Sequence, residues 1–490
     1  MADSATLPVP RALRAHAAPG GLSARSWTRT EPTRPAPAAR ALDVAVLIYD
    51  FRGSGAVRNA LRIAGRAAQA GLKVELWVVR DRGHLRASAP TGVEVVDLAG
   101  RAASPLPRFL DSLANVGALA RALAARRPAI LFSAANHMHI FAILARMKAR
   151  ATTPVRLVGR ASNAVLQASP KVLAGPFGGL AVWAAKTAQR LQFAAMDSIV
   201  AVAADLGADL VSALQIDHRR VSIIQNGIDI GRVAGPALAP LDDPWFAPGA
   251  PPVVLGAGRL SYQKDFPLLL KAFAKARRER PMRLIILGHG SAQQTRALHS
   301  LAGRLGVADD VRLEGFRANP FAYMARAAVF VLSSRWEGAS NVLLEAMACG
   351  CPVVATACPT GVADLLADGR WGPLSPVGDV DGLAGGILRR LDQPREAEAL
   401  RARAAEFDLD AAMDRYVEVF RQELAIARRG AESEDVAAQG DPHGARALRR
   451  RLADQAQGEG VAIGEGVAAA VHDVVDEGGR PPAFADQLSG

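Results

Sequence analysis

The sequence lacks a run of about 18 apolar residues, which a membrane-spanning helix would need. Its longest apolar stretch, residues 172–185, is interrupted by glycine and proline. The chain has only three cysteines, Cys349, Cys351 and Cys358. They have no paired C-x-x-C spacing and no histidine pattern beside them, so a zinc site is disfavoured and no metal is expected. Small buried thiols in a reducing cytosol are the better interpretation.

Two nucleotide-binding signatures are also missing. No G-x-G-x-x-G opens either half of the chain, which disfavours an NAD-dependent enzyme. Lys264 is neither preceded by glycine nor followed by serine or threonine, so its loop is not a Walker loop.

Charge is unevenly distributed along the chain. The net charge is +12, so an anionic partner is expected. Residues 43–232 hold 24 Lys and Arg against 12 Asp and Glu, whereas residues 238–428 are almost neutral. One interpretation is arginine-rich codon use on a solvated surface. The other is a face for anionic lipid or an anionic acceptor.

Short apolar runs alternate with helical patterns in two series. The first begins at Val44 and the second at Pro252; the predicted strands are 44–48, 73–79, 129–132, 155–158, 198–202 and 221–224, then 252–256, 283–287, 311–313, 329–332 and 352–355. This alternation predicts two doubly wound α/β domains that face a central cleft. We place the N-terminal domain at 41–235 and the C-terminal domain at 236–428. We expect residues 1–40 to be a disordered basic extension and residues 429–490 to be a disordered tail.

Glycine-rich loops follow several of the predicted strands. Gly53 and Gly55 follow the first strand, and Gly288 and Gly290 lie between a strand and a helix in the second half. The loop after residue 256 contains Gly258, Arg259 and Lys264, two cations at one strand tip that suit a pyrophosphate. A solvated basic loop is an equally good interpretation of this spacing.

Glu337 and Glu345 are eight residues apart. Gly338 allows a turn between them, and Ser340 or Asn341 can cap a helix that Gly350 and Pro352 end. Eight helical residues rise about 12 Å, roughly the span from the sugar to the ribose of a nucleotide-sugar. The helix N-terminus between the two carboxylates offers free N–H groups to a diphosphate. Capping and solvated charge are the alternative, but apolar neighbours on both sides favour function.

Taken together, these motifs resemble glycosyltransferase family 4, retaining enzymes of the GT-B fold. The similar segments are Gly256-x-Gly258-Arg259-x4-Lys264, Gly288-x-Gly290, Glu337-Gly338-x6-Glu345-Ala346, Asn226-Gly-Ile-Asp229 and 369–379. The resemblance covers about residues 43–420. It departs from the family at His289, where an acidic or amide residue is common, and at Asp364, which stands in place of a glutamate.

The resemblance implies roles for individual residues. Arg259 and Lys264 would stabilise the leaving diphosphate, Glu337 would contact the transferred sugar, and Glu345 would hold the ribose. The donor would also meet the backbone of the glycine loops and of the segment after Glu337; these donor-binding positions are Gly53, Gly55, Gly258, Gly288, Gly290, Gly338, Ala339, Ser340 and Asn341.

On the acceptor side the resemblance implies a histidine near the end of the strand at 129–132. Of the two candidates we place His137 at the reaction centre and His139 in acceptor binding. Arg160, at another strand tip, would meet an anionic acceptor. A structural histidine and a surface arginine are the alternatives.

The function implied is a retaining, metal-independent hexosyltransferase without a cofactor. Its donor would be a nucleotide-sugar, with UDP the expected nucleotide, and its acceptor a glycan or lipid-linked sugar of cell-envelope polysaccharide. We expect a cytoplasmic protein that is peripheral at the inner face of an anionic membrane, with no nucleic-acid partner. The alternatives are a nucleotide-sugar 2-epimerase of the same fold, which needs carboxylates in the N-terminal half, and a non-catalytic basic protein that binds membrane or nucleic acid.

Overall fold

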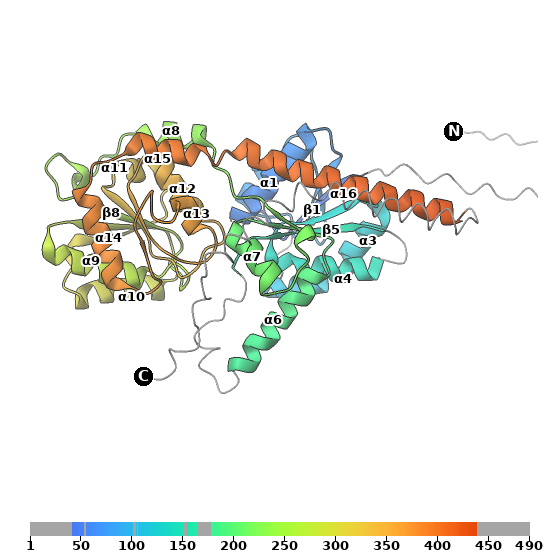
Figure 1. The fold of residues 1–490 in the computed structure, drawn as a ribbon, viewed down its shortest axis with the longest axis horizontal. Coiled ribbons are helices and arrows are strands. Elements are labelled where there is room, and N and C mark those ends of the chain that lie inside the picture. Colours follow the sequence, from blue (N-terminus) through green and yellow to red (C-terminus); the bar gives the residue numbers. More distant parts are fainter. Residues whose placement is uncertain are drawn as a thin grey trace, which may run out of the picture. The chain divides into compact units, whose positions relative to one another are not determined.

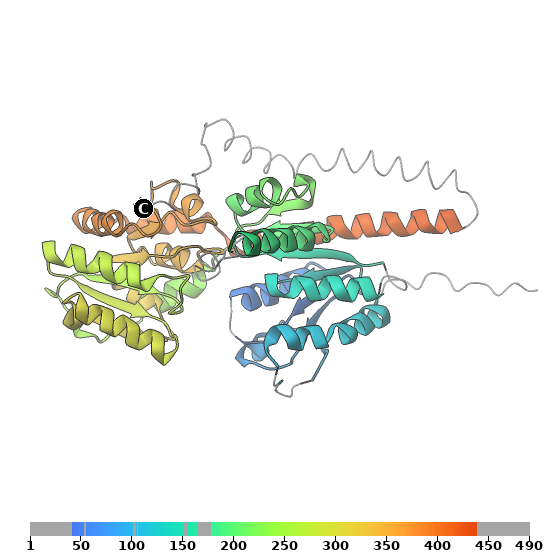
Figure 2. The ribbon, with the colours of Figure 1, turned by 90° about the horizontal axis from the view of Figure 1, so that it is seen from below.

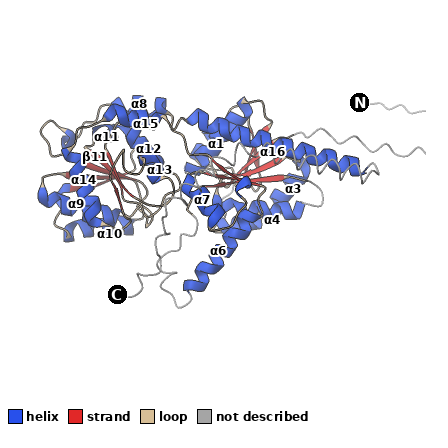
Figure 3. Cartoon of the chain, viewed as in Figure 1, coloured by secondary structure: helices blue, strands red, loops and turns tan. Residues whose placement is uncertain are grey.

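The computed structural model describes residues 42–52, 55–100, 104, 106–149, 154–164 and 178–438 (Figure 1). The predicted extension at 1–40 and residues 439–490 of the predicted tail lie outside the described residues. Within the described part, two parallel sheets are each enclosed by helices (Figure 3). The predicted α/β class with two doubly wound domains is confirmed.

The first sheet has the strand order β3-β2-β1-β4-β5-β6-β7, and every pairing is parallel. Its strands are β1 Val44–Ile48, β2 Val74–Val78, β3 Glu94–Asp97, β4 Ile130–Ser133, β5 Arg156–Ala161, β6 Ser198–Ala201 and β7 Val221–Ile223. The prediction missed β3 because this edge strand is only four residues long, and charged residues begin and end it.

Alternate residues of the first sheet point to two separate apolar layers. Val44 and Val46 pack with α1 (Gly55–Gln69) and α16 (Leu409–Ala438). Ala45 and Leu47 pack on the opposite face. The helices of that face include α3 Val116–Arg126, α4 His139–Ala149, α6 Gly178–Ala194 and α7 Ala204–Ser212, and α2 Arg108–Ala114 precedes α3. Burial on both faces explains why the strands are continuous apolar runs.

The second sheet has the order β10-β9-β8-β11-β12-β13. Its strands are β8 Val253–Ala257, β9 Arg283–Leu287, β10 Val311–Gly315, β11 Val329–Leu332, β12 Val353–Thr356 and β13 Leu374–Ser375. One face packs with α9 Phe266–Glu279, α10 Ala292–Arg304 and α14 Val380–Asp392, and the other with α8 Ile230–Leu238, α11 Phe321–Arg326, α12 Asn341–Ala348, α13 Val362–Leu366 and α15 Ala397–Ala405. The prediction missed β13, which has two residues.

The structure divides the chain differently from the predicted boundaries. Val233 of α8 packs in the core of the second domain, although it was predicted to end the first. Tyr416 and Phe420 of α16 pack against Phe132 of the first sheet at ring-centroid distances of 6.0 and 5.2 Å, although residues up to 428 were predicted to belong to the second domain. In Figures 1 and 2 α16 lies over the first domain, while α15 lies in the second. The helix continues to Ala438, beyond the predicted start of the tail.

Both sheets reverse their strand order next to their first strand. The reversal lies between β1 and β4 in the first sheet and between β8 and β11 in the second. In open α/β sheets, ligands bind outside the carboxyl ends of the strands at such a point. The loops that follow β1, β4, β8 and β11 are therefore the places to look for a site.

Candidate active site

The loops after β8 and β11 meet around a buried ion pair. Lys264 Nζ lies 2.7 Å from Glu337 Oε1, and only 16% and 6% of the two side chains are exposed. The Ser334 hydroxyl donates to the same carboxylate oxygen. One oxygen of the Glu337 carboxylate therefore has both a cation and a hydroxyl as partners, which offsets the cost of burying the charge.

Further bonds hold these two loops to each other. The Gln263 side-chain amide donates to the Trp336 carbonyl at 3.0 Å, and Ser333 Oγ donates to the Lys264 carbonyl at 2.9 Å. Because the bonds come from both sides of the switch point, the backbone positions of Lys264 and Glu337 are fixed relative to each other.

Three predicted donor-binding glycines are required by close packing of loops. Gly258 has φ +150°, and a Cβ at Gly288 would lie 1.8 Å from the Gly258 carbonyl oxygen. A Cβ at Gly290 would lie 2.6 Å from Leu260 Cβ. These contacts account for the glycines without a ligand, and their contact with the donor stays a prediction.

The N-terminus of α12 carries a serine without a partner. Ser340 precedes the helix and is 2% exposed, but its hydroxyl caps no N–H and has no partner among the described residues. The predicted side-chain cap is therefore wrong. Ser340 and Asn341 line a small pocket together with Asn226 and Gly361. An unpaired buried hydroxyl at a helix N-terminus suits a phosphate or sugar oxygen.

Glu345, one turn further into α12, is largely removed from solvent. Burial raises the pKa of its carboxyl to about 7, against the opposing effect of Arg58, Arg62, Lys264 and Arg232. Arg58 and Arg62 belong to α1 of the first domain, so the field at Glu345 comes from both domains. Burial also lowers the pKa of Arg62.

Two further predicted glycines lie where the domains touch. A Cβ at Gly338 would lie 2.1 Å from the Ser162 carbonyl oxygen, so a side chain there would displace the loop after β5. A Cβ at Gly55 would lie 3.6 Å from Asn341 Nδ2, which places the start of α1 next to the start of α12. Gly53 lies outside the described residues.

Arg259 stands apart from the other site residues. Its side chain is exposed and has no ion-pair or hydrogen-bond partner among the described residues. It lies two residues after the end of β8 and precedes Lys264 by five residues. A cation free to meet a ligand at this strand tip fits the predicted role, which stays a prediction.

The two histidines after β4 have opposite environments. His137 is exposed, and the surrounding protein and Arg108 lower the pKa of its ring. His139 is fully buried, and its Nδ1 lies 2.7 Å from Ser133 Oγ. Burial lowers the pKa of His139 to about 3, so its ring is neutral. The assignment of His139 to acceptor binding is wrong in this conformation, because no solute can reach the ring.

Arg160 is likewise buried rather than open to an acceptor. It is 2% exposed, its Nε donates to Tyr416 Oη at 2.9 Å, and its Nη2 donates to Asn226 Oδ1 at 2.7 Å. Asn226 Nδ2 in turn donates to Asn341 Oδ1 at 2.8 Å. The guanidinium therefore positions Asn226 and, through it, the start of α12. The predicted cleft-facing acceptor ligand is corrected to a positioning residue.

Two residues that complete the site, Asp205 and Asn226, were not expected from the sequence. Asp205 of α7 accepts from the backbone N–H of Thr360 at 2.5 Å and of Gly361 at 3.1 Å, so the first domain holds the loop that precedes α13. Asn226 stood in a recognised turn motif, but its contact with Asn341 joins positions 115 residues apart. Such pairings carry no local sequence signal.

Asp43 and Asp50, the two N-terminal carboxylates considered for the epimerase alternative, already have partners. Asp50 is 2% exposed and pairs with Arg52, and Asp43 accepts from the Lys73 backbone N–H before β1, away from the carboxyl ends of the strands. The epimerase alternative thus finds no free carboxylate in these two residues. No cluster of three or more His, Cys, Asp or Glu that could hold a metal occurs among the described residues.

Two family descriptions match the chain in this order. Glycosyltransferase Family 4 matches residues 53–232, and Glycosyl transferases group 1 matches residues 251–393. The chain belongs to glycosyltransferase family 4. The two matched segments correspond to the two sheets, and the second contains Arg259, Lys264, Glu337 and Glu345.

Curated relatives of this family 4 chain are glycosyltransferases by name. It is 32% identical over 198 residues to N-acetylgalactosamine-N,N'-diacetylbacillosaminyl-diphospho-undecaprenol 4-alpha-N-acetylgalactosaminyltransferase of Campylobacter jejuni, covering 40% of this chain and 51% of that protein. It is 36% identical over 188 residues to the lipopolysaccharide core biosynthesis glycosyltransferase LpsE of Rhizobium meliloti, covering 38% and 51%. The chain thus spans about half the length of these relatives.

Solved structures share the GT-B fold of family 4. A glycosyltransferase from Rickettsia africae aligns with TM-score 0.62 at 15% identity over 78% of this chain and 99% of its own. Sucrose-phosphate synthase from Thermosynechococcus elongatus aligns with TM-score 0.63 at 18% identity, covering 79% and 100%. Anabaena HepE in complex with UDP-glucose aligns with TM-score 0.60 at 19% identity, covering 78% and 100%. At these identities the likeness establishes the fold alone.

Proposed function

We propose that this protein is a retaining hexosyltransferase that moves a sugar from a UDP-sugar to a glycan or lipid-linked acceptor in cell-envelope polysaccharide synthesis. The observation that carries the proposal is the buried Lys264–Glu337 pair beside the α12 N-terminus, with an unpartnered Ser340 hydroxyl between Glu337 and Glu345. This arrangement provides a cation, the positive end of a helix dipole and two carboxylates around the start of α12.

The cations and the carboxylates of the site have different proposed roles. Lys264 and Arg259 would stabilise the diphosphate as the bond to the sugar breaks, which is usually the largest electrostatic contribution. Glu337 would bind sugar hydroxyls and Glu345 the ribose. No described side chain at the site is an evident covalent nucleophile, so the acceptor oxygen would attack from the side of the leaving group and its proton would pass to a phosphate oxygen. No metal or cofactor is part of this proposal.

The names of relatives suggest the substrates. The Campylobacter jejuni relative is named for a diphospho-undecaprenol acceptor and the Rhizobium meliloti relative for lipopolysaccharide core. Anabaena HepE was crystallised with UDP-glucose. We extend these to a UDP-sugar donor and a lipid-linked acceptor here. We also propose that the protein works at the inner face of the cytoplasmic membrane, to which the basic first domain would be attracted. None of the described helices is long and apolar enough to span a bilayer.

Two measurements test the proposal. A ligand that binds only the folded protein stabilises it, by about 2.7 kcal/mol of unfolding free energy at a hundredfold excess over Kd, and so raises its melting temperature. We expect UDP and a UDP-sugar to do so. Glu345→Gln should weaken the binding of UDP without a sugar. Glu337→Gln should leave the binding of UDP unchanged but reduce the transfer of labelled sugar to acceptors in membrane extracts. Equal loss of UDP binding in both variants would contradict the division of roles, and no response to any nucleotide would contradict the proposed activity.

A further inference from the structure

Helix α2 of the first domain is amphipathic in the reverse of the usual sense. Its polar face is buried: Asp111 and Ser112 are 1% and 2% exposed. Its apolar face is outside, where large hydrophobic side chains are 44–59% exposed; they are Leu106 just before the helix, Phe109, Leu110 and Leu113. We call these four residues the α2 ridge. Surface helices of globular proteins normally turn the apolar stripe toward the core.

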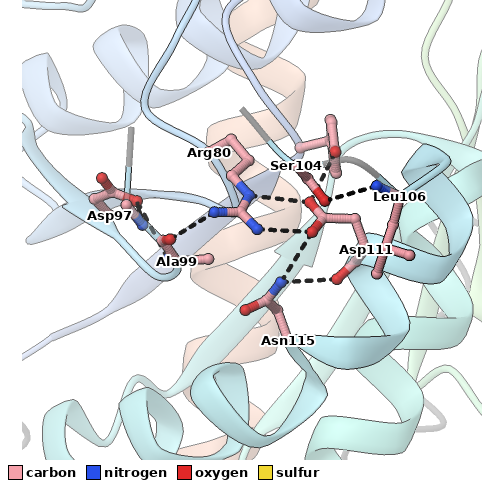
Figure 4. A network of polar contacts seen from close by, with 9 residues as sticks. Arg80, Asp97, Ala99, Ser104, Leu106, Asp111 and Asn115 are labelled. Atoms are coloured by element: carbon pink, nitrogen blue, oxygen red, sulfur yellow. Dashed lines mark hydrogen bonds and ion pairs between the residues drawn. The ribbon is translucent and has the colours of Figure 1, made fainter. Parts of the chain in front are cut away.

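A network of buried and partly buried polar contacts holds α2 in this orientation (Figure 4). Arg80, after β2, donates to Asp111 Oδ2 from Nε at 3.0 Å and to Oδ1 from Nη2 at 2.7 Å. Tyr49 Oη, after β1, donates to Oδ2 at 2.8 Å. The Arg80 guanidinium holds the pKa of the Asp111 carboxyl well below its usual range. A bidentate, buried pair of this kind fixes direction as well as position.

The surroundings of the α2 ridge are basic. Residues 106–149 contain six Lys and Arg and one carboxylate, the buried Asp111. Three of these cations, Arg108, Arg126 and Arg146, pair with carboxylates of other segments. A Cβ at Gly117 would lie 3.6 Å from Arg121 Nη1 and 3.7 Å from Lys148 Nζ, so these two cations gather over the start of α3. Both are exposed, and neither pairs with a carboxylate among the described residues. Met147, beside Lys148, is 65% exposed.

The α2 ridge also borders the reaction side of the first domain. Arg108, the first residue of α2, lies 3.5 Å from Asp50 at the end of β1. His137 follows β4, the neighbour of β1 at the switch point, and Arg108 acts on the pKa of its ring. A hydrophobic surface here is adjacent to the place where an acceptor would lie.

We propose that the α2 ridge inserts into the interfacial region of an anionic lipid bilayer. Apolar side chains with exposed cations nearby, here Arg121 and Lys148 at the start of α3, are what an interface of acyl chains and anionic headgroups binds. Exposed apolar surface of this kind on one helix marks an interaction site. The inference rests on the proposed function for its acceptor, since a lipid-linked acceptor lies in the same bilayer, but bilayer binding is measured without any donor or acceptor.

The first test reports insertion at one position. All three native cysteines are buried, so a solvent-sensitive thiol-reactive fluorophore will label an added exposed cysteine selectively. We expect the label on Leu110→Cys to shift to the blue with vesicles of phosphatidylcholine and phosphatidylglycerol. The matched control is Leu238→Cys at the end of α8, where the wild-type side chain is 82% exposed in the second domain. An unchanged label at position 110 while the protein sediments with vesicles would overturn the proposal.

The second test uses salt to separate insertion from attraction. Salt screens the attraction of exposed charges but leaves apolar burial in place. Wild type should keep part of its vesicle binding at high salt. In the triple variant Phe109→Ser, Leu110→Ser, Leu113→Ser, the affinity for vesicles at high salt should fall at least about tenfold. Leu238→Ser should match wild type.

Four outcomes would overturn the proposal. The triple variant could bind as wild type at high salt, or the wild type could fail to bind at all. Trp183→Ser could remove the salt-resistant binding alone, which would assign insertion to α6, where Trp183 is 63% exposed. The triple variant could instead change the oligomeric mass without changing vesicle binding, which would make the ridge an interface between copies. Binding of UDP by each variant, followed by thermal shift, separates all of these from failure of the proposed transferase activity.

Discussion

At the scale of single residues, the two cations of the β8 loop differ in their partners. Lys264 neutralises a buried carboxylate, whereas Arg259 is exposed and unpaired within the described chain. The same substitution should therefore have different effects on stability at the two positions, although both should damage transfer.

We expect Arg259→Ala to reduce kcat about 100- to 1000-fold without changing the melting temperature. Lys264→Ala should reduce kcat similarly and also cost up to about 3 kcal/mol of unfolding free energy, because Glu337 is left without its cation. The double variant Lys264→Ala, Glu337→Gln should recover stability but not activity. Chemical denaturation and initial rates with a UDP-sugar measure both effects. Wild-type turnover in Arg259→Ala would contradict its assignment.

The raised pKa of Glu345 makes a prediction about pH. The folded carboxyl has a pKa of about 7, above the ordinary value of 4.5, so the folded state holds a proton that the unfolded state has lost between these values. Unfolding free energy should then fall as pH rises from about 5 to 7, by at most about 3 kcal/mol from this group. Glu345→Gln should remove this fall.

The comparison of wild type with Glu345→Gln isolates the group, because other titrating residues are common to both. Denaturation midpoints at pH 5, 6, 7 and 8 provide the measurement. Parallel pH profiles for the two proteins would show that the carboxyl is not buried as described. The affinity for UDP should rise with pH more in wild type than in the variant, since an ionised carboxylate is the stronger acceptor of ribose hydroxyls.

At the scale of elements, α16 packs against strands and helices of the first domain that are distant from it in the sequence. It buries Tyr416 and Phe420 against the first sheet, and Arg156 of β5 pairs with its Glu423. Since these contacts form part of a domain core, removing α16 would expose apolar surface of β4 and α1.

We expect Phe420→Ala to lower the unfolding free energy of the first domain by about 3–5 kcal/mol, because a fully buried ring leaves a cavity. Ile426→Ala on the same helix, where the side chain is 36% exposed, should cost much less. Calorimetry resolves whether the loss falls on one transition or both. An effect confined to the second domain would show that α16 belongs there, as the sequence analysis had placed it.

At the scale of the whole molecule, two side chains of the first domain hold the helix starts that border the site. Asp205 accepts from the loop before α13, and Asn226 bonds to the first residue of α12. Both bonds disappear if the domains separate, so they favour the closed arrangement.

We expect Asp205→Ala to raise KM for the donor about tenfold or more, since two N–H bonds to a carboxylate are lost, while each domain keeps its own stability. Small-angle scattering with and without UDP would measure opening and closing. Asp209→Ala, on the same helix, is the control because its carboxylate contacts neither Thr360 nor Gly361 in any described bond. Unchanged KM and scattering in Asp205→Ala would mean that closure does not depend on this contact.

The sequence by itself determined the class of fold and most strands, because a strand buried on both faces must be a continuous apolar run whatever it packs against. It also determined the loops that carry Lys264 and Glu337 and the helix that carries Glu345, since glycines and charges at strand ends are local features. Tertiary structure decided what lies opposite these loops. Arginine and histidine are residue types that are common on protein surfaces, and only tertiary packing buries Arg160 and His139. The reversed polarity of α2 depends on Arg80, which is 31 residues from Asp111. The place of α16 depends on Phe132, almost 300 residues away, and no local pattern encodes a contact at such a separation.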